Sequence, residues 1–215
     1  MTRSAMKILI TAGPTREYLD DVRFLSNASS GKMGYALAQA ALEAGHKAVL
    51  VSGPTSLAPP TGCEFHAVET TGEMYDKCMA RFPKCDGVIG AAAVCDYRPR
   101  QRTSGKIAKT GKPLQLELVE TPDILAELGR RKQAARQWVV GFALESSNPR
   151  DNALRKLDAK GCDAILLNHP STIGTDASHV ELIDAGGQTV AIWTDSKIGI
   201  ARAIITWIDA SLARS

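Results

Sequence analysis

Apolar residues occur along this chain in short runs that alternate with longer amphipathic segments. Runs rich in Val, Ile, Leu and Ala predict buried strands at 8–12, 48–51, 65–68, 88–94, 114–118, 139–143 and 164–168. Apolar residues at every third or fourth position predict helices at 30–44, 72–82, 122–132, 150–160 and 197–212. Two further predicted strands, 180–183 and 190–193, flank the Gly186-Gly187 turn.

This alternation of strands and helices predicts an α/β fold. We expect a Rossmann-like, three-layer arrangement in which helices cover both faces of a mainly parallel sheet. The late strands add a sheet edge that could serve for dimerisation, because an open edge needs a cover. No linker or internal repeat divides residues 1–215, so we expect a single domain. Ligands of such sheets bind at the carboxyl ends of the strands, here the loops after Ala12, Val94 and Ala143.

Composition narrows the class of protein without naming a function. The chain is 44% hydrophobic and 23% charged, with a net charge of +3 that is too small to imply nucleic-acid binding by itself. Its five cysteines form no CxxC pair, which favours reduced thiols over a disulfide framework or a zinc ribbon. The N-terminus does not resemble a signal peptide, and no apolar run is long enough to span a membrane. We therefore expect a cytoplasmic protein without membrane contact.

The loop from Gly13 to Ser30, which leads into Gly31, is the first candidate site. Backbone N–H groups of Ser29, Ser30 and Gly31 could face a phosphate at a helix start. The alternative is a plain helix start with Ser30 as its N-cap, and the pattern leaves both open. No GxGxxG follows the first strand, and Lys32 is followed by Met33 instead of Ser or Thr. The dinucleotide fingerprint and the Walker A loop are therefore absent.

Three further features have both a functional and an ordinary interpretation. Asp96, just after a predicted strand, could hold a metal ion or a nucleotide hydroxyl, or simply form a turn. Residues 98–113 carry six basic side chains and no acidic one, so we expect a mobile basic lid whose Lys106 reaches a triphosphate. A solvated loop or a nucleic-acid arm would look similar. Lys156 and Lys160 lie four residues apart on one predicted helix, which by itself suggests no more than a solvated face.

Several motifs together carry a resemblance to a known family. They are ITAGPTRE (10–17), VRFLSNASSGKMG (22–34), AAAVCDYRP (91–99), SGKIAK (104–109), TPDIL (121–125) and VGFALE (140–145). In this order they closely resemble the phosphopantothenoyl-cysteine synthetases of coenzyme A biosynthesis, of bacterial type. The resemblance covers nearly the whole chain. Ala108 and Cys95 depart from the usual motifs.

The resemblance implies an amide-forming ligase that joins 4'-phosphopantothenate to L-cysteine. It implies an acyl-nucleotidylate intermediate, release of pyrophosphate and nucleoside monophosphate, and CTP in preference to ATP. It also implies Mg²⁺ or another divalent cation, no flavin, and a homodimer. In many bacteria such a domain follows a flavin-binding decarboxylase domain. We expect either a stand-alone enzyme or half of a bifunctional protein.

Matched position by position, the resemblance also assigns site residues. Asn27, Lys106 and Arg23 match catalytic positions, and Asp96 matches the carboxylate near the triphosphate and the metal. The positions expected to bind the nucleotide are Gly13, Ser29, Ser30, Gly31, Asp96, Lys106, Pro122, Asp123, Ile124, Leu125, Phe142, Lys156 and Lys160.

Two other classes of function remain as alternatives. One is a dinucleotide-binding oxidoreductase on the same fold, disfavoured by the missing fingerprint. The other is a non-catalytic nucleic-acid binder that uses the basic loop. Tyr97 is the only aromatic residue beside that loop, so the stacking side chains typical of such binders are lacking.

Overall fold

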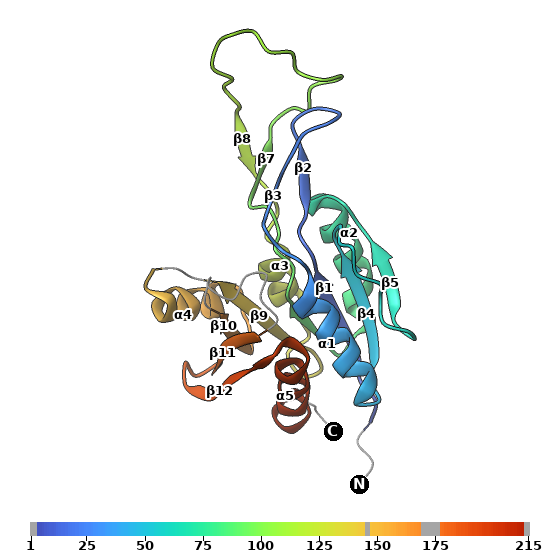
Figure 1. Cartoon of the computed structure of the whole chain (residues 1–215). Helices are drawn as coiled ribbons and strands as arrows, with labels where there is room; N and C mark the ends of the chain where they lie inside the picture. The colour runs from blue at the N-terminus through green and yellow to red at the C-terminus, as the bar shows by residue number, and fades with distance from the viewer. Residues whose placement is uncertain (1–3, 145–146, 169–176, 213–215) are drawn as a thin grey trace.

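The computed structural model describes residues 4–144, 147–168 and 177–212, and within them a three-layer α/β fold (Figure 1). Among these residues the central sheet has eight strands in the order β12-β11-β10-β9-β6-β1-β4-β5. The six strands from β10 to β5 in this order are parallel to one another, and β11 pairs antiparallel with both β10 and β12. The strands are β1 (Lys7–Ala12), β4 (Lys47–Ser52), β5 (Glu64–Ala67), β6 (Gly87–Gly90), β9 (Trp138–Leu144), β10 (Ala164–Asn168), β11 (Ala177–Asp184) and β12 (Thr189–Ser196).

Helices cover both faces of this sheet, which confirms the predicted fold class. Because successive side chains of a strand point to opposite faces, Ile8 and Ile10 belong to one core and Leu9 to the other. The first core packs against α1 (Lys32–Glu43) and α5 (Lys197–Ser211). The second core packs against α2 (Thr71–Arg81), α3 (Ile124–Arg131) and α4 (Pro149–Ala159).

The order of the strands defines where a ligand can bind. From β1 the chain runs outward to β4 and β5, and then returns to β6 on the other side of β1 before continuing to β9 and β10. The connections therefore change direction between β1 and β6. In open α/β sheets the carboxyl ends of the strands at such a switch point form a crevice.

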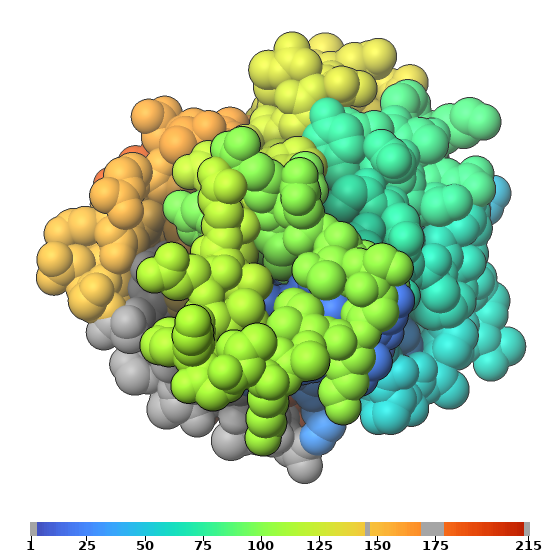
Figure 2. Space-filling view, turned by 90° about the horizontal axis from the view of Figure 1, so that it is seen from above, coloured from blue at the N-terminus to red at the C-terminus, as the bar shows by residue number. Residues whose placement is uncertain are grey.

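Two small hairpins rise from this carboxyl edge (Figure 1). One pairs β2 (Arg16–Tyr18) with β3 (Phe24–Ser26), and the other pairs β7 (Tyr97–Pro99) with β8 (Leu118–Glu120). Residues 100–117 form the long tip of the second hairpin and coincide with most of the predicted basic lid. Seen from above, this tip lies over the first hairpin (Figure 2).

The strand predicted at 114–118 is wrong. β8 begins only at Leu118, and Leu114 and Leu116 are 58% and 42% exposed. The alternation of leucine and polar residues suggests a half-buried strand, but its partner β7 ends at Pro99, so the upper part of the hairpin has no strand to pair with.

Two other predicted boundaries also need correction. The strand predicted at 88–94 ends at Gly90, because the next residues turn toward the loop after β1. Ala92 N–H donates to Thr11 Oγ1 (3.2 Å), and Ala93 N–H donates to the Gly13 carbonyl oxygen (2.9 Å). Ser30 is not the N-cap of α1, because Gly31 holds that position with a φ of 76°. A Cβ on residue 31 would lie only 2.7 Å from Thr55 Cγ2, so glycine is required there.

All five cysteines are free, in agreement with the expectation of reduced thiols. Burial raises the pKa of Cys78 and Cys162 to about 12 and that of Cys85 to about 11. Thiols with such pKa values are weak nucleophiles at neutral pH.

Of the helices that the structure describes, none has the length and apolar character needed to cross a membrane.

Candidate active site

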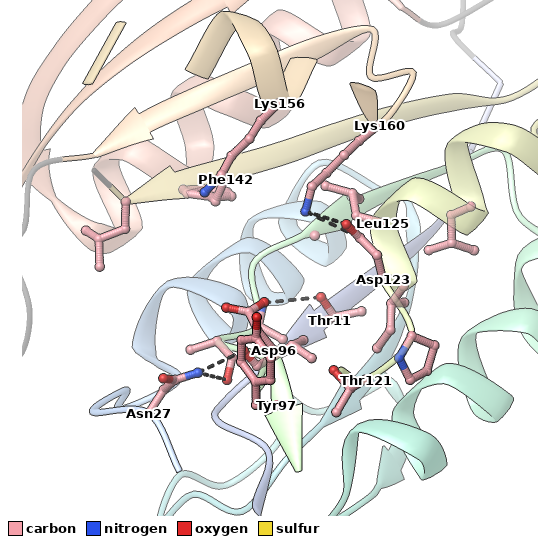
Figure 3. Close-up of a pocket in the computed structure, with 18 of the residues that line it drawn as sticks. Thr11, Asn27, Asp96, Tyr97, Thr121, Asp123, Leu125, Phe142, Lys156 and Lys160 are labelled. Atoms are coloured by element: carbon pink, nitrogen blue, oxygen red, sulfur yellow. Dashed lines mark hydrogen bonds and ion pairs between the residues drawn. The ribbon is translucent and has the colours of Figure 1, made fainter. Parts of the chain in front are cut away.

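A cleft of about 630 Å³ opens at the carboxyl ends of β1, β6 and β9, at the switch point of the sheet. Its volume falls in the range of small-molecule sites. Nine of the residues predicted for the site line it (Figure 3): Asn27, Asp96, Pro122, Asp123, Ile124, Leu125, Phe142, Lys156 and Lys160. They come from five separate parts of the chain, so the fold brings together residues that are distant in the sequence.

One wall of the cleft is the segment 91–96, which a closed set of buried hydrogen bonds holds in place. Cys95 N–H donates to Thr15 Oγ1 (2.8 Å), the hydroxyls of Thr15 and Thr71 lie 3.0 Å apart, and the Thr71 hydroxyl lies 3.4 Å from the Cys95 carbonyl oxygen. That carbonyl also accepts from the Thr121 hydroxyl (2.6 Å). The bonds fix the backbone immediately before Asp96.

Asp96 presents its carboxylate at the mouth of the cleft. Asp96 is exposed, and its backbone carbonyl oxygen accepts from Thr121 N–H (2.9 Å). Among the described residues, its carboxylate has no hydrogen-bond or ion-pair partner. No cluster of three or more His, Cys, Asp or Glu side chains suited to a metal ion occurs in the described part of the chain. A single free carboxylate fits Mg²⁺, which proteins usually bind through one or two carboxylates together with substrate phosphates.

The opposite end of the cleft is basic. Lys156 lies in the last turn of α4, and Lys160 is the C-cap that follows this helix; both line the cleft (Figure 3). Phe142, on β9, lies beside Lys156. Lys160 Nζ lies 3.0 Å from Asp123 Oδ2. Asp123 also accepts from Ala126 N–H (3.0 Å) as the N-cap of α3. The two ends of the cleft therefore differ in charge.

Asn27 lies at the edge of the cleft with its amide turned toward the wall. Asn27 Nδ2 donates to the carbonyl oxygens of Ala93 (3.1 Å) and Val94 (2.8 Å). Both amide hydrogens are thereby used, and Oδ1 is the atom left to face a ligand. Asn27 thus fixes the cleft wall as well as lining the cleft.

The other predicted site residues do not line this cleft. In the first loop, Ser29 N–H donates to the Asn27 carbonyl oxygen (2.9 Å) and Gly31 N–H to Ser29 Oγ (3.3 Å). These two N–H groups are therefore already satisfied within the loop. Whether Gly13, Ser29, Ser30 and Gly31 contact a nucleotide stays a prediction.

Arg23 and Lys106 both lie at the hairpins above the cleft. The Arg23 guanidinium binds the Asp20 carboxylate and the Ile107 carbonyl oxygen (2.8 Å to the latter). Lys106 is exposed on the lid, next to Ile107. Their catalytic roles stay predictions too.

The residues that hold the cleft wall were not predicted from the sequence. Thr15 and Thr71 are fully buried, and Glu17 is 6% exposed and accepts from Thr71 N–H (2.8 Å). The signal was present, because polar residues follow a buried strand directly at Pro14-Thr15-Arg16-Glu17. Their partners, however, lie more than 50 residues away, and local patterns do not reveal such contacts.

Comparisons with known proteins identify the family of this chain. A family model described as "DNA/pantothenate metabolism flavoprotein C-terminal domain" matches residues 4–212. The coenzyme A biosynthesis bifunctional protein CoaBC of Bacillus subtilis (strain 168) is 39% identical over 208 residues, which are 94% of this chain and 51% of that protein. The chain thus spans about half the length of the curated relatives that it matches.

Solved structures show the same fold. The crystal structure of the C-terminal domain of the coenzyme A biosynthesis bifunctional protein CoaBC has a TM-score of 0.82 at 36% identity, with 98% of this chain and 97% of that chain covered. A Cab2 mutant in complex with phosphopantothenate-cysteine has a TM-score of 0.76 over 97% of this chain and 88% of that one; at 17% identity it supports the fold alone. With nearly its whole length matched by the family model, this chain belongs to the DNA/pantothenate metabolism flavoprotein C-terminal domain family.

Proposed function

We propose that this chain is a phosphopantothenate–cysteine ligase that uses CTP. The observation that carries the proposal is the cleft at the switch point, which is lined by Asn27, Asp96 and the Lys156–Lys160 pair. These residues lie in motifs that resemble those of the synthetases. The names of the relatives, which refer to coenzyme A biosynthesis, support the same reaction.

The basic end of the cleft suits a nucleotide. Phe142 and Leu125 offer apolar surface to a base, and Lys156 and Lys160 offer donors. Lysine ammonium groups only donate hydrogen bonds, and the carbonyl oxygen of cytosine accepts them. Adenine has no carbonyl oxygen, and a site built around one base edge discriminates strongly against a base that lacks the matching group. The proposed co-substrate is therefore CTP, with ATP disfavoured.

The reaction then proceeds in two steps. The carboxylate of 4'-phosphopantothenate attacks the α-phosphorus of CTP, so that pyrophosphate leaves and an acyl-cytidylate forms. The amine of L-cysteine next attacks the acyl carbon, the amide forms, and CMP leaves. The protein contributes mainly by positioning the reactants and neutralising their charge.

Individual residues have proposed roles in these steps. Asp96 would hold Mg²⁺ together with the nucleotide phosphates, and the ion would neutralise phosphate charge. Lys106 supplies a further positive charge from the lid, as a lysine on a loop can do after the substrate binds. Asn27 faces the acyl group from the cleft edge, where its Oδ1 can accept a hydrogen bond from an attacking amine.

A homodimer is part of the proposal. β12 forms an edge of the sheet, and its Val190 and Ile192 are 44% and 59% exposed. An apolar edge strand of this kind is normally covered. A second copy of the chain would provide the cover.

Product analysis tests the proposed function. We expect mass spectrometry to detect the phosphopantothenate–cysteine amide only when 4'-phosphopantothenate, L-cysteine, CTP and Mg²⁺ are all present. We further expect kcat/KM for CTP to exceed that for ATP by at least tenfold at equal Mg²⁺. Amide formation without a nucleotide would refute the ligase, and equal or ATP-favouring values would refute the choice of nucleotide.

A further inference from the structure

Two carboxylates at the tip of the β2–β3 hairpin bind the backbone of the lid on either side of Lys106. Asp20 Oδ2 accepts from Ile107 N–H (3.1 Å), and Asp21 Oδ2 accepts from Gly105 N–H (2.6 Å). The residue between these two bonds is Lys106. The lid segment that carries the proposed cation is therefore attached to the hairpin at both of its neighbours.

Asp20 divides its two oxygens between separate tasks. Oδ1 accepts from the N–H groups of Val22 (2.8 Å) and Arg23 (2.7 Å), which is the usual way an aspartate stabilises a turn. Oδ2 binds the Arg23 guanidinium and Ile107 N–H. The side chain is 0% exposed. Arg23 and these backbone N–H groups hold the pKa of the Asp20 carboxyl well below its usual range, against the opposing effect of burial.

Further contacts strengthen this connection between hairpin and lid. Thr103 N–H donates to the Leu19 carbonyl oxygen (2.9 Å), and the Arg102 guanidinium stacks on the Tyr18 ring at 4.8 Å and binds Asp21. In contrast, the described residues 108–116 make no hydrogen bond to the hairpin. Attachment is thus confined to the part of the lid around Lys106.

We propose that Asp20 is a positioning residue that acts through Lys106. Its Oδ2 binds the lid backbone beside Lys106 and the guanidinium of Arg23 at the same time, so it holds both residues in one arrangement above the cleft. A turn alone would need only Oδ1, and the second oxygen is what links the hairpin to the lid. This inference rests on the proposed function, because it assigns Lys106 to the nucleotidylation step.

The Asp20→Asn variant separates the two tasks of this side chain. Asparagine keeps one oxygen for the turn and is itself favoured in turns, so the hairpin can still form. Its NH₂ group, in the place of Oδ2, faces the donors of Arg23 and Ile107 and cannot accept from them. Glu69→Gln is the matched control, because Glu69 binds the Tyr18 hydroxyl (2.6 Å) in the last strand pair before the turn and makes no hydrogen bond to the described residues of the lid.

Amide hydrogen exchange measures how firmly the lid is attached to the hairpin, and it does not depend on catalysis. In Asp20→Asn we expect at least tenfold faster exchange over residues 103–108, with exchange in the β-sheet unchanged. Glu69→Gln should leave the exchange of residues 103–108 as it is. Unchanged exchange in Asp20→Asn would overturn the proposed attachment.

A double-mutant cycle tests the action through Lys106. We expect Asp20→Asn to lower the rate of pyrophosphate release about 10- to 100-fold, as small misplacements of reacting groups do. In the Lys106→Gln background the same substitution should cost much less than in the unsubstituted protein, because only its effect through Arg23 is left. Multiplying effects, or a normal rate in Asp20→Asn despite a released lid, would overturn the positioning role. If the unsubstituted protein releases no pyrophosphate, the proposed function fails, and the exchange experiment still decides whether Asp20 holds the lid.

Discussion

Replacing Thr15 by valine probes the hydrogen bonds that hold the cleft wall. Valine has nearly the same shape as threonine, so Thr15→Val removes one hydroxyl and creates no sizeable cavity. The change leaves the buried N–H of Cys95 without its 2.8 Å acceptor. It also removes the hydroxyl that lies 3.0 Å from that of Thr71.

The expected loss of stability follows from counting these groups. An unsatisfied buried N–H costs about 1–3 kcal/mol and a lost neutral hydrogen bond about 0.5–1.5 kcal/mol, so Thr15→Val should lower the free energy of unfolding by about 2–4 kcal/mol. Thr71→Val is the matched comparison. When the Thr71 hydroxyl is removed, the Cys95 carbonyl oxygen still accepts from the Thr121 hydroxyl at 2.6 Å. Thr71→Val should therefore lower the free energy of unfolding by only about 1 kcal/mol.

Urea unfolding measures both variants. The midpoints should shift in the order Thr15→Val more than Thr71→Val, with similar m-values. Because Cys95 precedes Asp96, Thr15→Val should also weaken CTP binding more than Thr71→Val does. Equal losses of stability, or a larger loss in Thr71→Val, would show that the Cys95 N–H does not depend on Thr15.

Three further predictions concern the site and the assembly. Gly129→Ala places a Cβ 1.9 Å from the Lys160 carbonyl oxygen and should lower both the melting temperature and CTP affinity. Gly72→Ala, whose Cβ would meet only Thr70 Oγ1 at an ordinary contact distance of 3.9 Å, should leave the melting temperature equal or higher. The reverse order would contradict the close approach of α3 to Lys160. Asn27→Asp places a carboxylate against the carbonyl oxygens of Ala93 and Val94. Rapid-quench measurement should then show accumulated acyl-cytidylate and slow amide formation. Normal amide formation would exclude the proposed role of Asn27. Light scattering should give twice the chain mass of 23.0 kDa, and the mass of one chain at micromolar concentration would count against the dimer.

Hydrophobic patterning predicted the sheet well where both faces of a strand are buried. β10 occupies the predicted residues 164–168, because Ala164 to Leu167 are buried between helices on both sides. The same reasoning failed at 114–117, where the leucines are exposed and β7 does not extend far enough to pair with them, because it ends opposite Leu118. The β2–β3 hairpin was missed because its three-residue strands carry charged and aromatic side chains without an apolar run.

The site was predictable only in part. Asp96, Phe142 and Lys156, which the motifs indicated, line the cleft, since each follows or faces the carboxyl end of a strand, and their roles in binding stay predictions. The orientation of the Asn27 amide and the attachment of the lid by Asp20 depend on contacts across more than 60 residues. In the sequence Asp20 resembles an ordinary turn residue, and only the folded chain shows that its second oxygen binds the lid.

Pyrophosphate release reports directly on the proposed activation of 4'-phosphopantothenate by CTP. With CTP, Mg²⁺ and 4'-phosphopantothenate, the protein should release about one pyrophosphate per active site, and added L-cysteine should convert this burst into continuous turnover. CTP with cysteine alone should give none. Release that does not depend on 4'-phosphopantothenate, or no release at all with the complete set of substrates, would contradict the account.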